Sequence, residues 1–133
     1  MSEAIANEEE RGGLELPEIP LFPLRTVLFP EGVLPLRIFE PRYVDMIRWC
    51  MRNQVNFGVV LLRTGSDVAN KDADAVPDVF RVGTEAKIVD FNQADNGLLG
   101  IVAQGARKFS IKESYLQKDG LLKATVEFAK EEA

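Results

Sequence analysis

Prolines gathered in one short stretch constrain the fold of this chain more than any other sequence feature. Six of the seven prolines lie between residues 17 and 41. Proline has no backbone N–H and fixes φ, so this stretch cannot form a long helix or a strand paired on both sides. Large apolar residues alternate with the prolines, which indicates core packing rather than a proline-rich ligand for another protein. We therefore expect short or edge strands at residues 19–25 and 33–39, with a turn at residues 30–32 between them.

The last proline of this stretch marks the start of a helix. Pro41 suits the first helical position, and Glu40 places a negative charge at the positive end of the helix dipole. We expect the helix to span residues 41–52, because apolar residues recur there at helical spacing: Tyr43, Val44, Ile47, Cys50 and Met51. Cys50 lies on that apolar face and is interpreted as a buried core residue rather than a reactive thiol. Three basic residues are expected to pair with Glu40 or Asp45 and fasten the helix to the sheet: Arg25, Arg37 and Arg42.

The rest of the chain has the patterns of strands and turns. Residues 57–63 form a nearly continuous apolar run, typical of a central strand buried on both faces. After a polar loop at 64–78, four further strands are expected, at residues 80–91, 98–103, 108–115 and 122–128. Favoured two-residue turn chemistry occurs at Asn96 and Gly97, and another turn is expected at Asp119 and Gly120. The fold class is therefore mainly β, with about six short, mostly antiparallel strands and one early α-helix, in a partly closed barrel that hides most strand edges.

Charge divides the chain into two regions. The chain has 133 residues and a net charge of −5; residues 1–18 hold six acidic residues and one basic residue, whereas residues 19–133 hold 15 of each. This predicts a disordered acidic leader at residues 1–16 and one neutral domain at residues 17–133. A neutral body is a weak basis for binding a phosphate backbone. No signal segment is recognisable, and the longest apolar run is too short to span a bilayer, so a cytoplasmic location without membrane contact is expected.

Residue content excludes most catalytic and metal chemistries. The chain has no histidine and one cysteine, which removes Ser-His-Asp and Cys-His catalysis and zinc sites built from these residues. It contains no glycine-rich phosphate loop. The acidic segment at residues 67–78 lacks the Gly and the final Glu that a calcium-binding loop requires. Ser110 and Lys112 are interpreted as residues on the polar face of a strand rather than as a Ser-Lys catalytic pair. We predict that the protein is not an enzyme and has no catalytic residue, metal site or cofactor.

Four separated blocks of the sequence carry a family resemblance. They are IPLFPLR at residues 19–25, FP at 29–30, LPLRIFEPRY at 34–43 and VGT at 82–84. In order and spacing they resemble the N-terminal domain of the ATP-dependent protease Lon family, and most of all its stand-alone bacterial relatives, which lack the protease. The resemblance implies a PUA-like pseudo-barrel that recognises unfolded or tagged substrate proteins and aids oligomer assembly. In the family, a helical part follows the β part. We expect this helical part to be absent from residues 17–133.

A polypeptide-binding module is the function that these features favour. We expect the contact surface to be exposed apolar residues around the proline-rich turn: Val27, Leu28, Phe29, Pro30 and Val33. The alternative for each of them is that its side chain fills the barrel. Other functions left open are a PUA-like RNA-binding module, whose nearest signal is the basic stretch at residues 107–112, and a purely structural or oligomerisation domain. The expected partners are unfolded or tagged polypeptides, with homo-oligomer formation and without nucleic acid or membrane.

Overall fold

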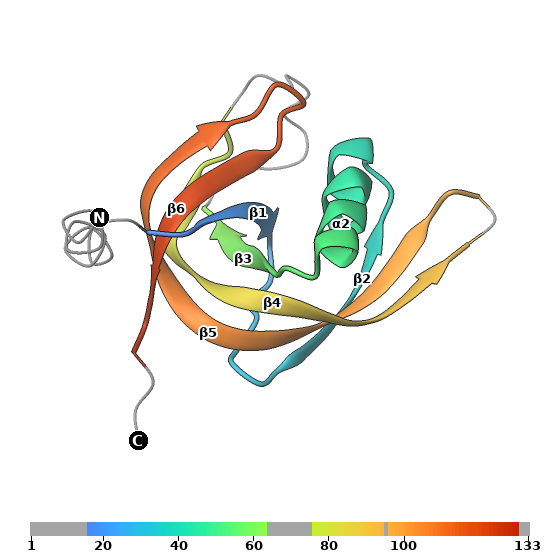
Figure 1. Cartoon of the computed structure of the whole chain (residues 1–133), viewed down its shortest axis with the longest axis horizontal. Coiled ribbons are helices and arrows are strands. Elements are labelled where there is room, and N and C mark those ends of the chain that lie inside the picture. The colour runs from blue at the N-terminus through green and yellow to red at the C-terminus, as the bar shows by residue number, and fades with distance from the viewer. Residues whose placement is uncertain (1–15, 64–75, 95, 131–133) are drawn as a thin grey trace, which may run out of the picture.

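The structure, a computed structural model, describes residues 16–63, 76–94 and 96–130. Within these residues, six strands and one helix follow one another (Figure 1). They are β1 (Glu18–Leu24), β2 (Val33–Ile38), α2 (Pro41–Asn53), β3 (Phe57–Leu62), β4 (Val79–Gln93), β5 (Leu99–Leu116) and β6 (Leu122–Phe128). The mainly β fold with one early helix is therefore confirmed. The predicted acidic leader and most of the predicted polar loop lie outside the described residues.

The strands form one sheet that closes on itself. The strand order is β2-β5-β4-β3-β1-β6. Strand β5 also pairs with β6, and this pairing closes a ring of five strands: β5, β4, β3, β1 and β6. Strand β2 remains outside this ring, paired only with the first half of β5. The β1–β3 pair is parallel, and the other pairs are antiparallel. The result is the expected pseudo-barrel, in which β2 retains a free edge.

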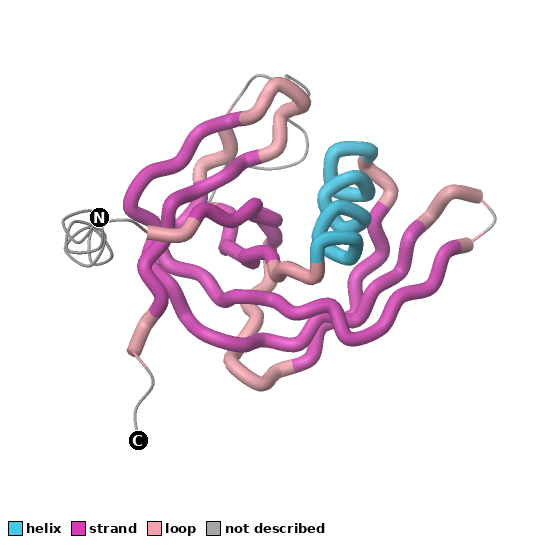
Figure 2. The backbone as a smooth tube through the Cα atoms, in the orientation of Figure 1, coloured by secondary structure: helices cyan, strands magenta, loops and turns pink. Residues whose placement is uncertain are grey.

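Strand β5 is longer than the sequence indicated. Two separate strands were expected at residues 98–103 and 108–115, but a single strand runs from Leu99 to Leu116 (Figure 2). The prediction of a break was wrong because β4 pairs with both halves of β5. Two register shifts in the β4–β5 ladder, near Thr84 and Ile88, accompany this pairing. Such irregularities bend a strand without ending it, so β5 passes from its partner β2 to its partner β6.

Strand β1 accommodates its prolines by changing partner. Its first half, Glu18 to Pro20, pairs with β6, and its second half, Leu21 to Leu24, pairs with β3. Each part of β1 is therefore paired on one side, so Pro20 and Pro23 lack an N–H without interrupting a two-sided ladder. The expectation of short or edge strands is met by both: β2 is the end strand of the sheet, and β1 is a short strand of 7 residues.

Both hairpin turns end on a glycine with positive φ. Gly97 has φ 85° and Gly120 has φ 89°, values that favour residues without a side chain. The closing bonds run from Ala94 N to Leu98 O at 2.9 Å and from Gln117 N to Leu121 O at 2.8 Å. Three residues therefore lie inside each turn, rather than the two expected at Asn96 and Gly97, and the glycine is the last of the three.

Helix α2 begins at Pro41, as expected, and ends one residue later than expected. Gln54 adopts the left-handed conformation that terminates it, at φ 56°. Arg42 fastens the helix: its Nη1 donates to Gly120 O at 2.9 Å, and its Nη2 lies 3.6 Å from Glu40 Oε2. The expected Arg42–Glu40 pair is thus confirmed. The helix buries Tyr43, Met46, Ile47 and Cys50, whereas Val44 and Met51 are half-buried.

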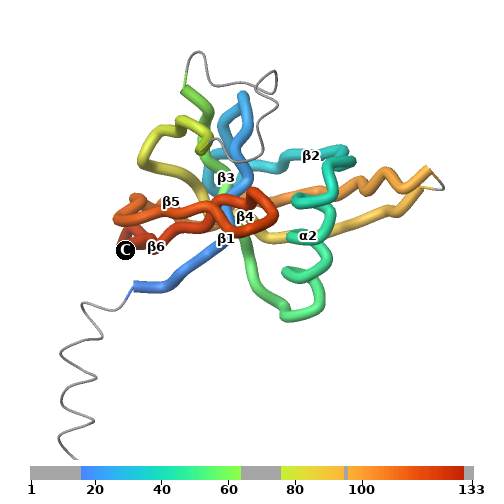
Figure 3. The backbone as a smooth tube through the Cα atoms, turned by 90° about the horizontal axis from the view of Figure 1, so that it is seen from above, coloured from blue at the N-terminus to red at the C-terminus, as the bar shows by residue number. Residues whose placement is uncertain are grey.

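Two clusters of buried side chains lie on opposite sides of β1 and β3. The first cluster lies between α2 and the sheet and includes Phe22 and Val59; the second is enclosed by β1, β3, β5 and β6 and includes Leu21 and Val60. Successive residues of each strand point to opposite faces, so β3 is buried on both faces, as predicted. In the first cluster the Tyr43 ring stacks on Phe22 at 4.4 Å between centroids. Helix α2 lies over the concave side of the bent β4–β5 hairpin (Figure 1), and Figure 3 shows the helix and the hairpin from above.

Candidate binding pocket

An apolar pocket lies where the loop after β1 approaches β3, β4, β5 and the end of β6. Its volume is about 660 Å³. The floor is made of buried side chains, Leu28, Val59 and Phe109, each at most 3% exposed. The rim is apolar but open to solvent: Val27 49%, Phe29 66%, Phe80 41% and Val82 63% exposed. Exposed apolar surface around a buried apolar floor is typical of interaction sites.

The structure brings together three of the five residues expected at a contact surface. Val27, Leu28 and Phe29 line the pocket, whereas Pro30 and Val33 are exposed but lie outside it. The expectation that Leu28 is exposed was wrong: it is 3% exposed, because it packs into the first cluster and anchors the loop. Phe80, Val82 and Phe128 were missed. Phe80 and Val82 alternate with Arg81, which places them on one face of β4, but such alternation could not show whether that face is buried or open.

A glycine of β5 holds the loop that carries Phe29. Glu31 N donates to Gly105 O, and Gly105 N donates to Gly32 O, both at 2.8 Å. A side chain at position 105 would collide with the Phe29 carbonyl oxygen, so only glycine allows the two backbones to lie this close. The loop is thus docked on β5 by its backbone, which leaves the Phe29 side chain at the rim.

A second glycine makes room for the floor. A Cβ atom at Gly83 would lie 2.5 Å from Val59 O and 2.6 Å from Cζ of Phe109. Because Gly83 has no side chain, the Phe109 ring packs directly against the backbone where β3 pairs with β4. Phe109 also meets Phe128 edge to face at 6.1 Å between centroids.

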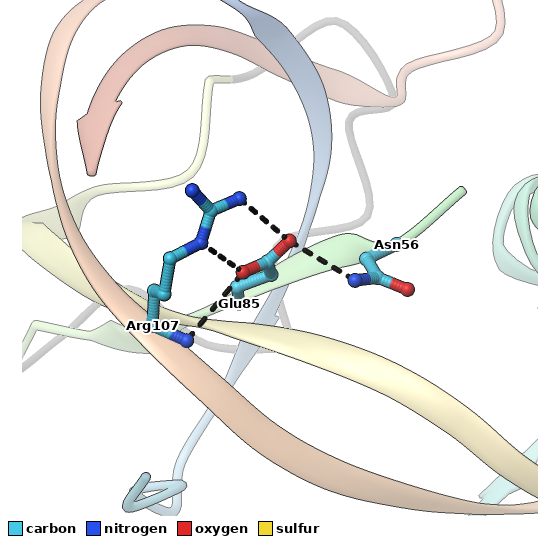
Figure 4. Close-up of polar contacts among 3 residues, drawn as sticks. All are labelled: Asn56, Glu85 and Arg107. Atoms are coloured by element: carbon cyan, nitrogen blue, oxygen red, sulfur yellow. Dashed lines mark hydrogen bonds and ion pairs between the residues drawn. The ribbon is translucent and has the colours of Figure 1, made fainter. Parts of the chain in front are cut away.

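A buried carboxylate fixes the strands beside the pocket (Figure 4). Glu85, 8% exposed, receives hydrogen bonds from Arg107 Nε at 2.9 Å, Arg107 Nη2 at 3.3 Å and Asn56 Nδ2 at 3.0 Å. Burial alone would raise the pKa of Glu85, but these bonds and the charge of Arg107 outweigh it and lower the pKa. The Arg107 guanidinium also lies over the Phe128 ring at 3.8 Å. One ion pair therefore joins β4 to β5 and supports an aromatic wall of the pocket.

The residues considered for chemistry are accounted for by ordinary contacts. Ser110 is half-buried and lines the pocket, and Lys112 Nζ lies 3.3 Å from Glu127 Oε1. Cys50 is fully buried, and burial raises the pKa of its thiol to about 11, which confirms the interpretation of a core cysteine. Among the residues that the structure describes, no cluster of acidic or cysteine side chains could hold a metal ion. In the same residues, no helix has the length and apolar content needed to cross a membrane.

Comparison with known proteins assigns the chain to a family. The profile of the ATP-dependent protease La (LON) substrate-binding domain matches residues 18–133. The chain belongs to this family. The resemblance carried by the four sequence blocks is confirmed, and the chain is therefore related to substrate-binding domains rather than to the catalytic parts of Lon.

Relatives show how much of a Lon protein this chain represents. A Lon protease of Anaeromyxobacter dehalogenans is 32% identical over 110 residues, which cover 82% of this chain and 12% of the relative. A Lon protease of Flavobacterium johnsoniae is also 32% identical over 110 residues, covering 80% of this chain and 13% of the relative. The chain thus spans about an eighth of the length of these relatives.

Solved structures of Lon N-terminal domains share the fold. The crystal structure of a Lon N-terminal domain protein from Xanthomonas campestris is 35% identical, with a TM-score of 0.72 over 86% of this chain and 61% of that one. The N-terminal domain of a Mycobacterium avium complex Lon protease is 15% identical, with a TM-score of 0.65 over 88% of this chain and 57% of that one. The second likeness supports the fold alone.

Proposed function

We propose that this domain is a non-catalytic module that recognises unfolded or tagged polypeptides through the apolar pocket. The observation that carries the proposal is the pocket itself, which combines a buried apolar floor with exposed aromatic and aliphatic residues at its rim. Membership of the Lon substrate-binding family supplies the class of ligand. Apolar side chains that a folded protein would bury are the groups that such a surface can remove from water. The domain is expected to act in the cytoplasm, to aid assembly into a homo-oligomer, and to bind without turnover.

Insertion of apolar side chains into the pocket is a better explanation of the proposed polypeptide binding than addition of a peptide strand to β2. Strand β2 is the end strand of the sheet and has a free edge, where an added strand would need its outward N–H and C=O groups. Gly105 N donates to Gly32 O, so the even-numbered residues that follow Gly32 face β5 and Pro35 faces outward. Pro35 has no N–H to offer, which leaves a gap in the middle of the edge. The pocket has no such defect.

An RNA-binding function has less support from the geometry. Its nearest sequence signal was the basic stretch at residues 107–112. Arg107 is engaged by Glu85, and Lys112 by Glu127. Two of the three cations in the stretch are therefore paired, which weakens any attraction to a phosphate backbone.

The proposal is tested by an NMR titration of the labelled chain with a reduced, permanently unfolded protein. We expect binding on the order of tens of micromolar or weaker, because a small surface must offset the ordering of a flexible chain. Amide shifts should cluster at Phe29, Phe80 and Val82 and persist in high salt. Shifts that are confined to Arg107, Lys108 and Lys112 and that are abolished by salt would instead identify a basic surface that binds anions such as RNA.

A pair of matched variants shows whether the pocket is the binding surface. Val82→Asp places a charge on the rim, whereas Val89→Asp makes the same change at an exposed valine of the same strand outside the pocket. We expect Val82→Asp to weaken binding about ten-fold, since an apolar contact is replaced by a carboxylate that must be desolvated. Val89→Asp should bind like the unmodified chain. Equal affinity of the two variants would exclude the pocket as the contact surface.

A further inference from the structure

Two lysines stand at the rim of the apolar pocket. Lys108 on β5 and Lys130 after β6 both line it, and both side chains are exposed. A backbone bond from Ala129 N to Lys108 O, at 2.7 Å, places their chain segments side by side. In the part of the chain that the structure describes, no carboxylate lies within ion-pair distance of either ammonium group.

The acidic residues near the pocket are already engaged with other cations. Glu127, which lines the pocket, lies 3.3 Å from Lys112. Glu85 is held by Arg107, and Asp78 lies 3.4 Å from Arg63, whose guanidinium lies over the Phe80 ring at the rim. Each of these acidic groups thus has its own basic partner, and among the described residues the charges of Lys108 and Lys130 remain as a local excess beside an apolar cavity.

We propose that the pocket selects polypeptide segments whose apolar residues are flanked by aspartate or glutamate. The apolar side chains enter the cavity, and an adjacent carboxylate reaches Lys108 or Lys130 at the rim. This inference rests on the proposed function, because it assigns a sequence preference to the same site. Opposite charge at a rim acts on selectivity more than on total affinity. Lysine suits a loose preference, since its ammonium is a flexible point charge rather than a planar fork.

The preference is modest and depends on salt. Exposed ion pairs contribute little, so two of them correspond to a preference of about three- to ten-fold for acidic over neutral flanks. Solvent-exposed charges are screened within about 8 Å at physiological ionic strength, so the preference should shrink toward unity in high salt. The affinity for the apolar segment itself should change little under the same conditions.

Four blocked peptides, acetylated and amidated to remove terminal charges, test the inference by fluorescence titration. Three share one apolar core and carry glutamate, serine or lysine flanks; the fourth has glutamate flanks around a serine core. For the unmodified chain we expect the order glutamate, serine, lysine in decreasing affinity, and no binding of the fourth peptide. Equal affinity of the first three at low salt would overturn the flank preference. Binding of the fourth as tightly as the first would overturn it as well, by showing a general anion patch.

Charge-reversal variants assign the preference to the two lysines. In Lys108→Glu/Lys130→Glu the preference should invert, so that lysine flanks bind best. The matched control is Lys118→Glu, an exposed lysine in the turn at the opposite end of β6 from Lys130, and its peptide order should stay unchanged. A control that inverts as well, or a double variant that keeps the original order with an unaltered circular dichroism spectrum, would refute the assignment. Absence of binding by all three apolar peptides would instead mean that the proposed function fails.

Discussion

The helix-covered half of the molecule and the pocket end use aromatic residues in opposite ways. Under α2, Phe22 and Tyr43 stack and are at most 9% exposed. At the pocket, Phe29 and Phe80 are 66% and 41% exposed, although Phe80 lies within β4 and Phe29 lies in the loop that joins β1 to β2 of the same sheet. The helix supplies large side chains that fill the first half. At the other end, glycines let backbones approach, so the floor is buried while the rim stays exposed. The proposed binding pocket thus lies where the sheet is covered by backbone rather than by a helix.

The largest expected effect tests whether the helix-covered half depends on side-chain packing. Ile47 is fully buried, and Ile47→Asp would leave a carboxylate without a partner in an apolar cluster. We expect a loss of about 3 to 5 kcal/mol in the free energy of unfolding, measured by urea denaturation. Arg48→Asp, at the next and exposed position of the helix, should cost less than about 1 kcal/mol. Equal stability of the two variants would show that α2 does not hold this half together.

The next prediction tests whether backbone approach forms the pocket end. Gly105→Ala forces a methyl group against the Phe29 carbonyl, with an expected cost of about 1 to 3 kcal/mol and weaker polypeptide binding. Gly100→Ala on the same strand is the control, because its Cβ would have no neighbour closer than 3.6 Å. Thermal melts and the NMR titration should separate the two variants. The docking of the loop on β5 would be disproved if Gly105→Ala bound and melted like Gly100→Ala.

A smaller effect concerns the carboxylate between the strands of the pocket end. Because the folded state lowers the pKa of Glu85, ionised Glu85 stabilises the fold above the ordinary carboxyl pKa. That contribution is lost as the pH falls through the lowered pKa. We expect Glu85→Gln to cost about 1 to 2 kcal/mol at neutral pH, and the melting temperatures of the two proteins should converge on acidification. If the difference in melting temperature stayed constant across the acidic range, the Arg107–Glu85 ion pair would not be the source of the stabilisation.

The smallest effect changes reactivity and leaves the fold intact. Cys50 is the chain's one cysteine, and burial raises the pKa of its thiol to about 11, so iodoacetamide at pH 8 should react slowly until the protein unfolds. A cysteine placed at Val82 in a Cys50→Ala background should react as fast as a free thiol, because this rim position is 63% exposed. Similar rates at the two positions would contradict the division into a closed half and an open end.

Much of the fold follows from local patterns. The start of α2 at Pro41 was predictable because proline suits the first turn, and its buried face was predictable from helical spacing. Met46 was missed although it is buried, because the buried stripe follows Tyr43, Met46, Ile47 and Cys50 rather than a face that includes Val44 and Met51, which are half-buried. The double-sided burial of β3 was equally readable from its continuous apolar run. These features depend on residues that are close in the sequence.

The candidate site was only partly predictable. Val27, Leu28 and Phe29, which were expected at a contact surface, line the pocket, but nothing in the sequence placed them beside Phe80, Val82 and Phe128. Proximity of these residues depends on the pairing of β3, β4, β5 and β6, and on the bonds that dock the loop on Gly105. A glycine in a strand signals a close approach without naming the partner.

The sequence by itself determined the kind of protein: a mainly β member of the Lon substrate-binding family, without histidine chemistry and with an early helix that begins at Pro41. Only the tertiary structure decided that β5 is one strand, that β1 changes partners, and that Leu28 points inward while Phe29 stays at the surface. The physical reason is the sequence separation over which each interaction acts. Helical spacing, turn chemistry and proline restriction act between near neighbours, whereas the pocket is made by segments that meet only after the sheet has closed.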